Sequence, residues 1–201
     1  MTITTSTAKR VRAMRWAVVP AALIVSGLVI GQASYAAFTS TTSNATNSWA
    51  SGTVALSDDD AGTAMFTATN LKPGSTGTRC IVVTSTGTLA SAVKLYGVTP
   101  ATTNALSTYL DVTVVQGTGG TFGSCTGFAA LTTGSSVYSG TLANFGTSAT
   151  SFATGLGTWA PTGSASESRT FQITYTLNAA APNSSQGGTA SIGFTWEAQN
   201  T

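Results

Sequence analysis

Two stretches near the C-terminal end of the chain alternate regularly between apolar and polar residues, at positions 171–177 and 190–198. An extended backbone points successive side chains to opposite faces, so this period of two predicts half-buried β-strands. Shorter runs of the same kind lie at residues 64–68, 80–84, 93–98 and 110–115, separated by turn sequences rich in glycine, proline and asparagine. We therefore predict an all-β fold, with about seven to nine short strands in a sandwich or barrel.

The chain carries few charges for its length. Charged residues make up 7% of the sequence, against about 25% in an ordinary soluble domain, and histidine is absent. A hydrophobic content of 42% argues against a disordered chain. A formal net charge of +2 does not provide the basic surface that a nucleic-acid-binding protein needs, so we expect no nucleic-acid partner.

A secretory signal peptide is predicted at the N-terminus. A basic segment at residues 9–15 precedes an apolar run from Trp16 to Ile30, and small residues follow it, which places the cleavage site between Ala36 and Ala37. A permanent membrane anchor is the alternative, but the run is shorter than the about 20 residues that span a bilayer. We therefore expect a secreted protein, with membrane contact only through the signal peptide before cleavage.

Cleavage at this site changes the charge of the protein. The first 36 residues hold four of the eight Lys and Arg residues and none of the six Asp and Glu residues, so the mature chain has a formal charge of −2. The remaining residues, about 165 in number, suit a single domain with a sizeable core. The basic character of the full sequence therefore belongs to the leader.

Cys80 and Cys125 are the two cysteines of the chain. In an oxidising compartment an even number of cysteines predicts a disulfide. Two buried free thiols or a metal pair are the alternatives, but two cysteines without histidine cannot complete a structural zinc site. We predict a Cys80–Cys125 disulfide, whose loop of about 45 residues would contribute roughly 4 kcal/mol in the chain-entropy model.

The densest group of charges in the mature chain is Asp58, Asp59 and Asp60, followed by Gly62. Carboxylates at the end of a strand are possible ligands of Ca²⁺, which prefers oxygen. Their spacing does not match an EF-hand loop, and adjacent carboxylates are more often a solvated turn. We treat them as a weak calcium candidate and expect neither a metal nor another cofactor.

The sequence offers little to support hydrolytic chemistry. Without histidine, the commonest general base is missing and no His-Glu-x-x-His motif is possible. Glu167 and Glu197 are isolated from one another, and no Gly-x-Ser-x-Gly sequence frames a serine for Lys72 or Lys94 to activate. We therefore predict that the protein is not an enzyme.

Three further segments occur in a distinctive order. Behind the predicted leader, an aromatic opening rich in Thr and Ser leads to Asn-Ser-Trp-Ala-Ser-Gly at residues 47–52. Asn-Leu-Lys-Pro-Gly at 70–74 ends one run and is followed by Ser-Thr-Gly-Thr-Leu at 85–89, and Asn-Ser-Ser-Gln-Gly at 183–187 precedes the last predicted strand. In this order they resemble the TasA/camelysin family of secreted fibre-forming proteins of bacterial biofilms. The cysteine pair is not part of that motif, and residues 117–168 match the family poorly.

The resemblance implies a jelly-roll sandwich and a division into a signal peptide (1–36), an N-terminal donor strand (37–50) and the β-sandwich domain (51–201). It also implies assembly into extracellular filaments, with the protein itself and possibly co-secreted fibre or anchor proteins as partners. The sequence independently permits this, because residues 37–50 lack charge and proline and carry Phe38 and Trp49 as anchors. A floppy terminus or an ordinary first strand is the alternative for this segment.

A different class of function also fits a secreted sandwich. Such a fold can bind glycans or a cell-surface partner as a monomer, with exposed aromatic rings as stacking platforms. Trp49, Trp159 and Tyr138 are the candidates for that role. We expect assembly to be the function and glycan binding to be the alternative.

Overall fold

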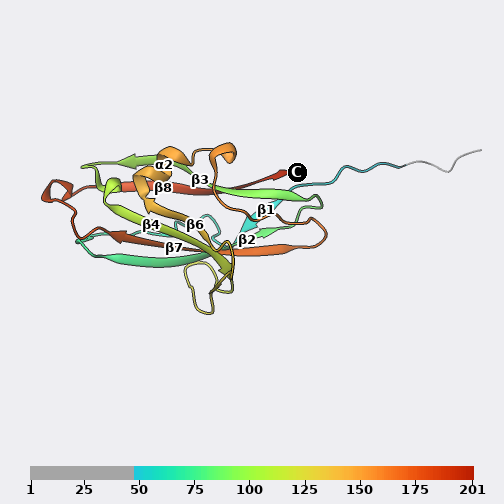
Figure 1. Cartoon of the computed structure of the whole chain (residues 1–201), viewed down its shortest axis with the longest axis horizontal. Helices are drawn as coiled ribbons and strands as arrows, with labels where there is room; N and C mark the ends of the chain where they lie inside the picture. Colours follow the sequence, from blue (N-terminus) through green and yellow to red (C-terminus); the bar gives the residue numbers. More distant parts are fainter. Residues whose placement is uncertain (1–47) are drawn as a thin grey trace, which may run out of the picture. The chain divides into compact units, whose positions relative to one another are not determined.

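The computed structural model describes residues 48–201, of which residues 50–201 form one compact unit (Figure 1). The predicted cleavage site, Phe38 and most of the donor-strand candidate lie outside the described residues. The strands are β1 (Leu56–Asp58), β2 (Thr76–Ser85), β3 (Ser91–Thr102), β4 (Leu110–Thr118), β5 (Ala129–Ala130), β6 (Ser136–Thr141), β7 (Glu167–Leu177) and β8 (Ala190–Asn200). The helical segments are α2 (Leu142–Ser148) and the 3₁₀ turns η1 (Leu106–Thr108), η2 (Phe152–Thr154) and η3 (Asn183–Ser185). None of the helices in this part of the chain is long and apolar enough to span a bilayer.

The strands form two antiparallel sheets that face each other (Figure 1). The larger sheet has the order β1-β2-β7-β4, and both β5 and β6 pair with β4. The smaller sheet consists of β3 and β8. Because β2 pairs with β7 and β3 with β8, strands far apart in the sequence are neighbours, as in a jelly roll. The predicted all-β sandwich is confirmed.

The inward faces of the two sheets form the main core. Phe171 and Ile173 on β7 are 2% and 1% exposed, as their alternation predicted, and the fully buried Phe145 of α2 lies between the sheets. The Phe145 ring lies 5.0 Å from the Tyr138 ring and 5.5 Å from the Phe194 ring, measured between centroids. Helix α2 begins at a cap in which the Thr141 side chain accepts a hydrogen bond from the backbone N–H of Asn144.

One predicted strand does not form. Residues 64–68 include a bend at Met65, and no backbone hydrogen bond joins them to another strand of the described chain. Their apolar side chains cover the core instead: Met65 and Phe66 pack against it, and the Phe66 ring meets the Tyr175 ring nearly at right angles, 5.2 Å away. The partly buried residues, Met65 and Phe66, are consecutive, so burial does not alternate in this segment and the strand prediction is wrong.

Candidate assembly site: the sheet edges and the disulfide loop

Strand β8 has one bonded edge and one open edge. On its partner β3, the N–H groups of the odd-numbered residues point away from β8, because Val93 donates to Trp159 O at 2.9 Å and Leu95 to Leu156 O at 2.8 Å. The even-numbered residues of β3 therefore bond to β8, and they lie opposite Gly193, Thr195, Glu197 and Gln199. It follows that the backbone groups of Ile192, Phe194, Trp196 and Ala198 point to the other edge, where no backbone of the described chain pairs with them.

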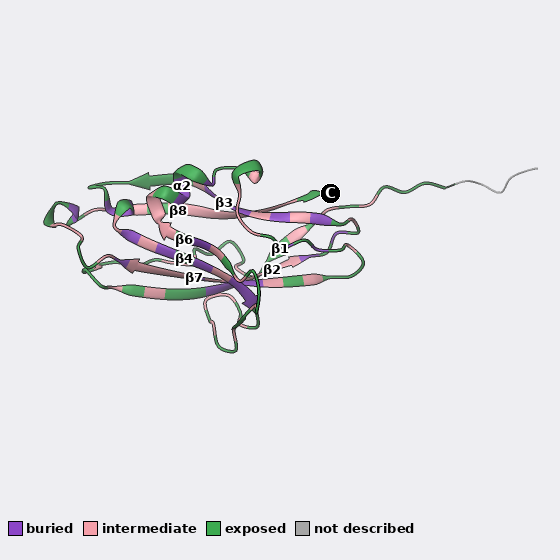
Figure 2. Ribbon diagram, in the orientation of Figure 1, coloured by how far each residue is buried: buried purple, intermediate pink, exposed green. Residues whose placement is uncertain are grey.

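The side chains along this open edge are apolar and only partly covered. Residues at even positions of β8 face the core, as shown by the 5.2 Å separation of the Trp196 and Phe171 rings. They are nevertheless intermediate in exposure, whereas the inward residues of β3 opposite them are buried (Figure 2). The core-facing side chains of β8 beside its open edge are therefore only partly covered.

The outer edge of β2, in the other sheet, is closed at several points, each by a different group. Strand β1 pairs with Val83–Ser85. Beyond it, the Asp59 carboxylate accepts the N–H of Val82 at 2.8 Å, and the carbonyl oxygen of Cys80 accepts the N–H of Gly123 at 2.9 Å. The carbonyl oxygen of Thr78 accepts a hydrogen bond from the Arg79 guanidinium at 3.2 Å. The two sheet edges therefore differ: that of β2 is capped at these points, whereas the open edge of β8 has no backbone partner in the described chain.

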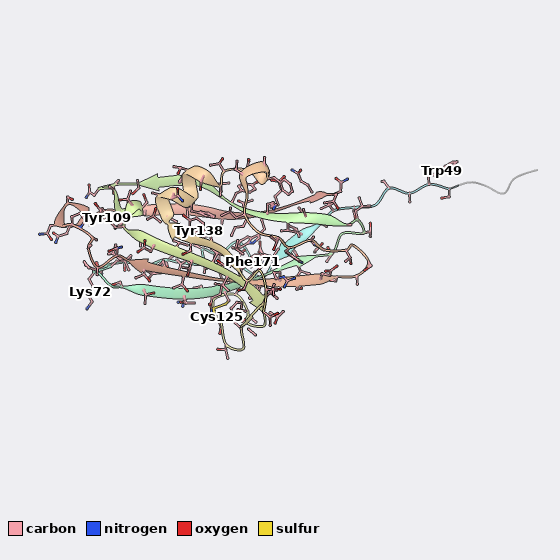
Figure 3. The ribbon with its side chains drawn as sticks, viewed as in Figure 1. Trp49, Lys72, Tyr109, Cys125, Tyr138 and Phe171 are labelled. Atoms are coloured by element: carbon pink, nitrogen blue, oxygen red, sulfur yellow. A yellow bond between two sulfur atoms is a disulfide. The ribbon has the colours of Figure 1, made fainter. Side chains whose placement is uncertain are left out.

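One of the caps on β2, the N–H of Gly123, comes from the loop at residues 119–128, which hangs below the larger sheet in Figure 1. The predicted disulfide is present: Cys125 in this loop is bonded to Cys80 on β2, 45 residues away (Figure 3). The Asp59 carboxylate also accepts the N–H of Phe122 at 2.7 Å, so one side chain joins the loop to the strand edge. Cys80 is fully buried beneath the loop.

The aspartate cluster is not arranged around a cation. Asp58 accepts from the N–H of Asp60 at 3.3 Å, Asp60 accepts from Gly62, and Asp59 reaches β2 and the loop. Burial raises the pKa of Asp58. The described residues contain no group of three or more His, Cys, Asp or Glu side chains placed to hold a metal ion. Each carboxylate satisfies backbone N–H groups, which is the behaviour of a structured turn.

The charged residues weighed for hydrolysis have structural contacts of their own. Glu167 accepts from the Thr162 hydroxyl at 2.7 Å and from its N–H at 2.6 Å, and both hydrogen bonds lower the pKa of Glu167. Glu197 accepts from Gln199 and Tyr96, each at 2.8 Å, and these bonds lower the pKa of Glu197. Lys94 donates to the carbonyl oxygen of Gly157 at 2.7 Å. Lys72 lies in an exposed turn.

Two of the three aromatic residues considered for glycan stacking are inside the sandwich. Trp159 is 5% exposed and Tyr138 is 9% exposed, and Figure 3 shows Tyr138 between the sheets. Neither ring can be offered to a ligand, so the prediction is wrong for both residues. Trp49 is 88% exposed. Sequence reasoning also missed Arg169, whose guanidinium lies 5.9 Å from the centre of the Trp159 ring, because nothing in the pattern marks an inward-facing cation.

Comparison with known proteins identifies the family. Residues 9–115, more than half of the chain, match the family described as camelysin metallo-endopeptidase. No curated protein matches the chain. The description implies a catalytic metal, but the residues present do not fit the usual zinc centre of a metallopeptidase, because the sequence has no histidine and both cysteines are bonded to each other. The chain belongs to the camelysin family.

Proposed function

We propose that the mature protein is an exported structural subunit that polymerises into extracellular fibres. In this proposal, residues 37–50 of one copy add as a strand to the open edge of β8 in the next copy. The observation that carries the proposal is the contrast between the two sheet edges, since the open edge of β8 has no backbone partner in the described chain, whereas the edge of β2 is interrupted by hydrogen bonds at Val82, Cys80 and Thr78. Main-chain pairing at an exposed edge is the general basis of β-augmentation.

The dimensions of the two partners agree. Strand β8 has 11 residues, which extend over about 37 Å at about 3.4 Å per residue. Residues 37–50 reach about 48 Å at the same rise, so the segment can run along the whole edge with residues left over as a connection. Strand β6, at the far edge of the larger sheet, has only six residues and an irregular register with β4. The register of β8 with β3 is also irregular, between Val98 and Ala101, but the edge of β8 is nearly twice as long as that of β6 and is therefore the better acceptor.

The chemistry of the two partners also agrees. The incoming segment has no charged side chain and no proline, so its backbone N–H groups are available and no side-chain ion has to be desolvated. The open edge presents the partly exposed rings of Phe194 and Trp196. Phe38 and Trp49 are separated by an odd number of positions, so an unbroken strand places their rings on opposite faces. One of these two rings would face the core beside β8 and the other would remain outside.

The proposal excludes peptidase activity, in contrast to the description of the family. A zinc hydrolase needs protein ligands and a general base around the metal, and this chain lacks histidine throughout. Incubation of the purified mature protein with casein and Zn²⁺ should release no peptides above a heat-inactivated sample. Zinc-dependent cleavage that disappears with a chelator would contradict this part of the proposal.

A proline scan of β8 tests the acceptor edge with a matched control. Ala198→Pro removes an N–H that points to the open edge, so the subunit should fold normally and fail to polymerise. Gln199→Pro removes an N–H that bonds to β3, so it should lower the stability of the monomer itself. Electron microscopy and sedimentation report assembly, and urea titration reports folding. Fibres of the Ala198→Pro protein equal to those of the wild type would overturn the assignment of β8.

The donor segment is tested by comparing protein that begins at Ala37 with protein that begins at Ser51. The longer protein should form fibres and the shorter one should remain monomeric, because the domain at residues 50–201 keeps its sheets and core in both. Phe38→Ala and Trp49→Ala in the longer protein then identify the inserted ring, since only the inward one should weaken assembly strongly. Persistent monomers from the protein that begins at Ala37 would refute the proposed function.

A further inference from the structure

Some of the outward-pointing backbone groups of β2 form hydrogen bonds with parts of the chain outside the sheet. The even-numbered residues of β2 point away from β7, as shown by the N–H of Val82 and the carbonyl oxygen of Cys80, which both bond outside the sheet. Strand β1 is only three residues long and pairs with Val83–Ser85. The remaining edge, Thr76–Val82, has seven residues, about 24 Å at 3.4 Å per residue, which is longer than a typical strand.

The residues of this edge are well suited to pairing. Apart from Arg79 the stretch is uncharged, and it contains the β-branched residues Thr76, Thr78, Ile81 and Val82. Natural sheet edges of this kind are normally protected by lysine, proline or a bulge, and Thr76–Val82 contains neither lysine nor proline. The protection comes instead from Asp59 and from the loop at residues 119–128.

We propose that the Cys80–Cys125 disulfide and Asp59 together close a second self-association edge, whose partner is the same β2 edge of another copy. Two such edges can pair antiparallel about a two-fold axis, because each offers its own donors opposite the other's acceptors. The disulfide holds the loop over Cys80, and the Asp59 carboxylate occupies the N–H of Val82 while holding Phe122 of the loop. The inference rests on the proposed function in one respect: it explains how the β2 edge of a fibre subunit is kept from acting as a second acceptor.

The test uses the protein that begins at Ser51, which has no donor segment. Both sheets and both apolar clusters lie within residues 50–201, so this protein retains the whole folded unit. With the disulfide intact it should be monomeric. The double variant Cys80→Ala/Cys125→Ala should dimerise at least tenfold more tightly in sedimentation equilibrium, and amide hydrogen exchange over residues 78–82 should slow as the dimer forms.

Two single variants keep the test decisive if the double variant does not fold. Asp59→Ala retains the disulfide but frees the N–H groups of Val82 and Phe122, so it should also strengthen dimerisation. Asp60→Ala is the matched control, because that carboxylate accepts from Gly62 and is bonded to neither Val82 nor Phe122. Dimers in Asp59→Ala, with Asp60→Ala monomeric, would support the proposal.

Two results would overturn it. One is a folded double variant that stays monomeric, and the other is an Asp59→Ala protein that associates no more than Asp60→Ala. Both are measured without the donor segment, so they do not depend on fibre formation. If dimers appear here while the protein that begins at Ala37 forms no fibres, only the proposed function fails.

Discussion

Removal of the disulfide has an effect on stability that can be calculated from the chain. Cys80 and Cys125 are 45 residues apart, and closing a loop of that length lowers the entropy of the unfolded chain by about 13 cal/mol/K, or about 4 kcal/mol at 25 °C. A domain of about 150 residues unfolds with an entropy near 0.3 kcal/mol/K, so the melting temperature of Cys80→Ser/Cys125→Ser should fall by about 12 °C. The control Ser124→Ala, which keeps the disulfide in the same loop, should change little.

Differential scanning calorimetry and urea titration measure this effect. Because the disulfide acts on the unfolded chain, its loss should also raise the urea m-value, since the unfolded state expands. The folded state should keep its near-ultraviolet circular dichroism. A fall in melting temperature of less than about 3 °C, corresponding to about 1 kcal/mol, would refute the reasoning. It would mean that the loop and β2 stay together in the unfolded ensemble without the bond.

Three other changes probe the core and one surface carboxylate. Phe145→Ala should lower the free energy of unfolding by about 3–5 kcal/mol, because it empties the centre of the main core, and urea titration measures the loss. Gly97→Val should lower the free energy of unfolding by about 1–3 kcal/mol in the same titration, since a Cβ at this position would lie 2.6 Å from the side chain of Ile192 and 3.1 Å from the Phe145 ring. A Gly97→Val protein as stable as the wild type would contradict that close packing. The hydrogen bonds from Thr162 lower the folded-state pKa of Glu167 below the usual pKa of a glutamate. The ionised Glu167 side chain therefore stabilises the folded protein above that usual pKa, and this stabilisation is lost as the pH falls through the folded-state pKa. Glu167→Gln should therefore reduce the difference in urea midpoint between pH 7 and about pH 3, and an unchanged difference would count against this contact.

The sequence predicts which face of a strand is buried more reliably than it predicts which strands pair. The alternation at residues 171–177 correctly identified Phe171 and Ile173 as core residues, because the period of two depends only on an extended backbone beside a core. The same pattern at 64–68 did not produce a strand, since pairing needs a partner edge that a local pattern does not specify. For the same reason, the alternation on β8 could not reveal that one of its edges is open.

Individual side chains at the site were harder to predict than the strands. Cysteine count and compartment were sufficient for the Cys80–Cys125 pair. Asp59 looked no different from Asp58 and Asp60, because only the fold brings its carboxylate to Val82 and Phe122. Trp159 and Tyr138 lie in the part of the chain with the weakest pattern, so nothing in the sequence distinguished buried from exposed aromatic rings there.

Hydrogen exchange along β8 tests the central claim most directly, because the strand contains its own control. The N–H groups of Thr195 and Glu197 bond to β3, so they should exchange slowly in monomer and fibre alike. The N–H groups of Phe194 and Trp196 face the open edge, so they should exchange quickly in the protein that begins at Ser51 and slowly in fibres of the protein that begins at Ala37. Fibres in which Phe194 and Trp196 exchange as quickly as in the monomer would contradict strand addition at β8.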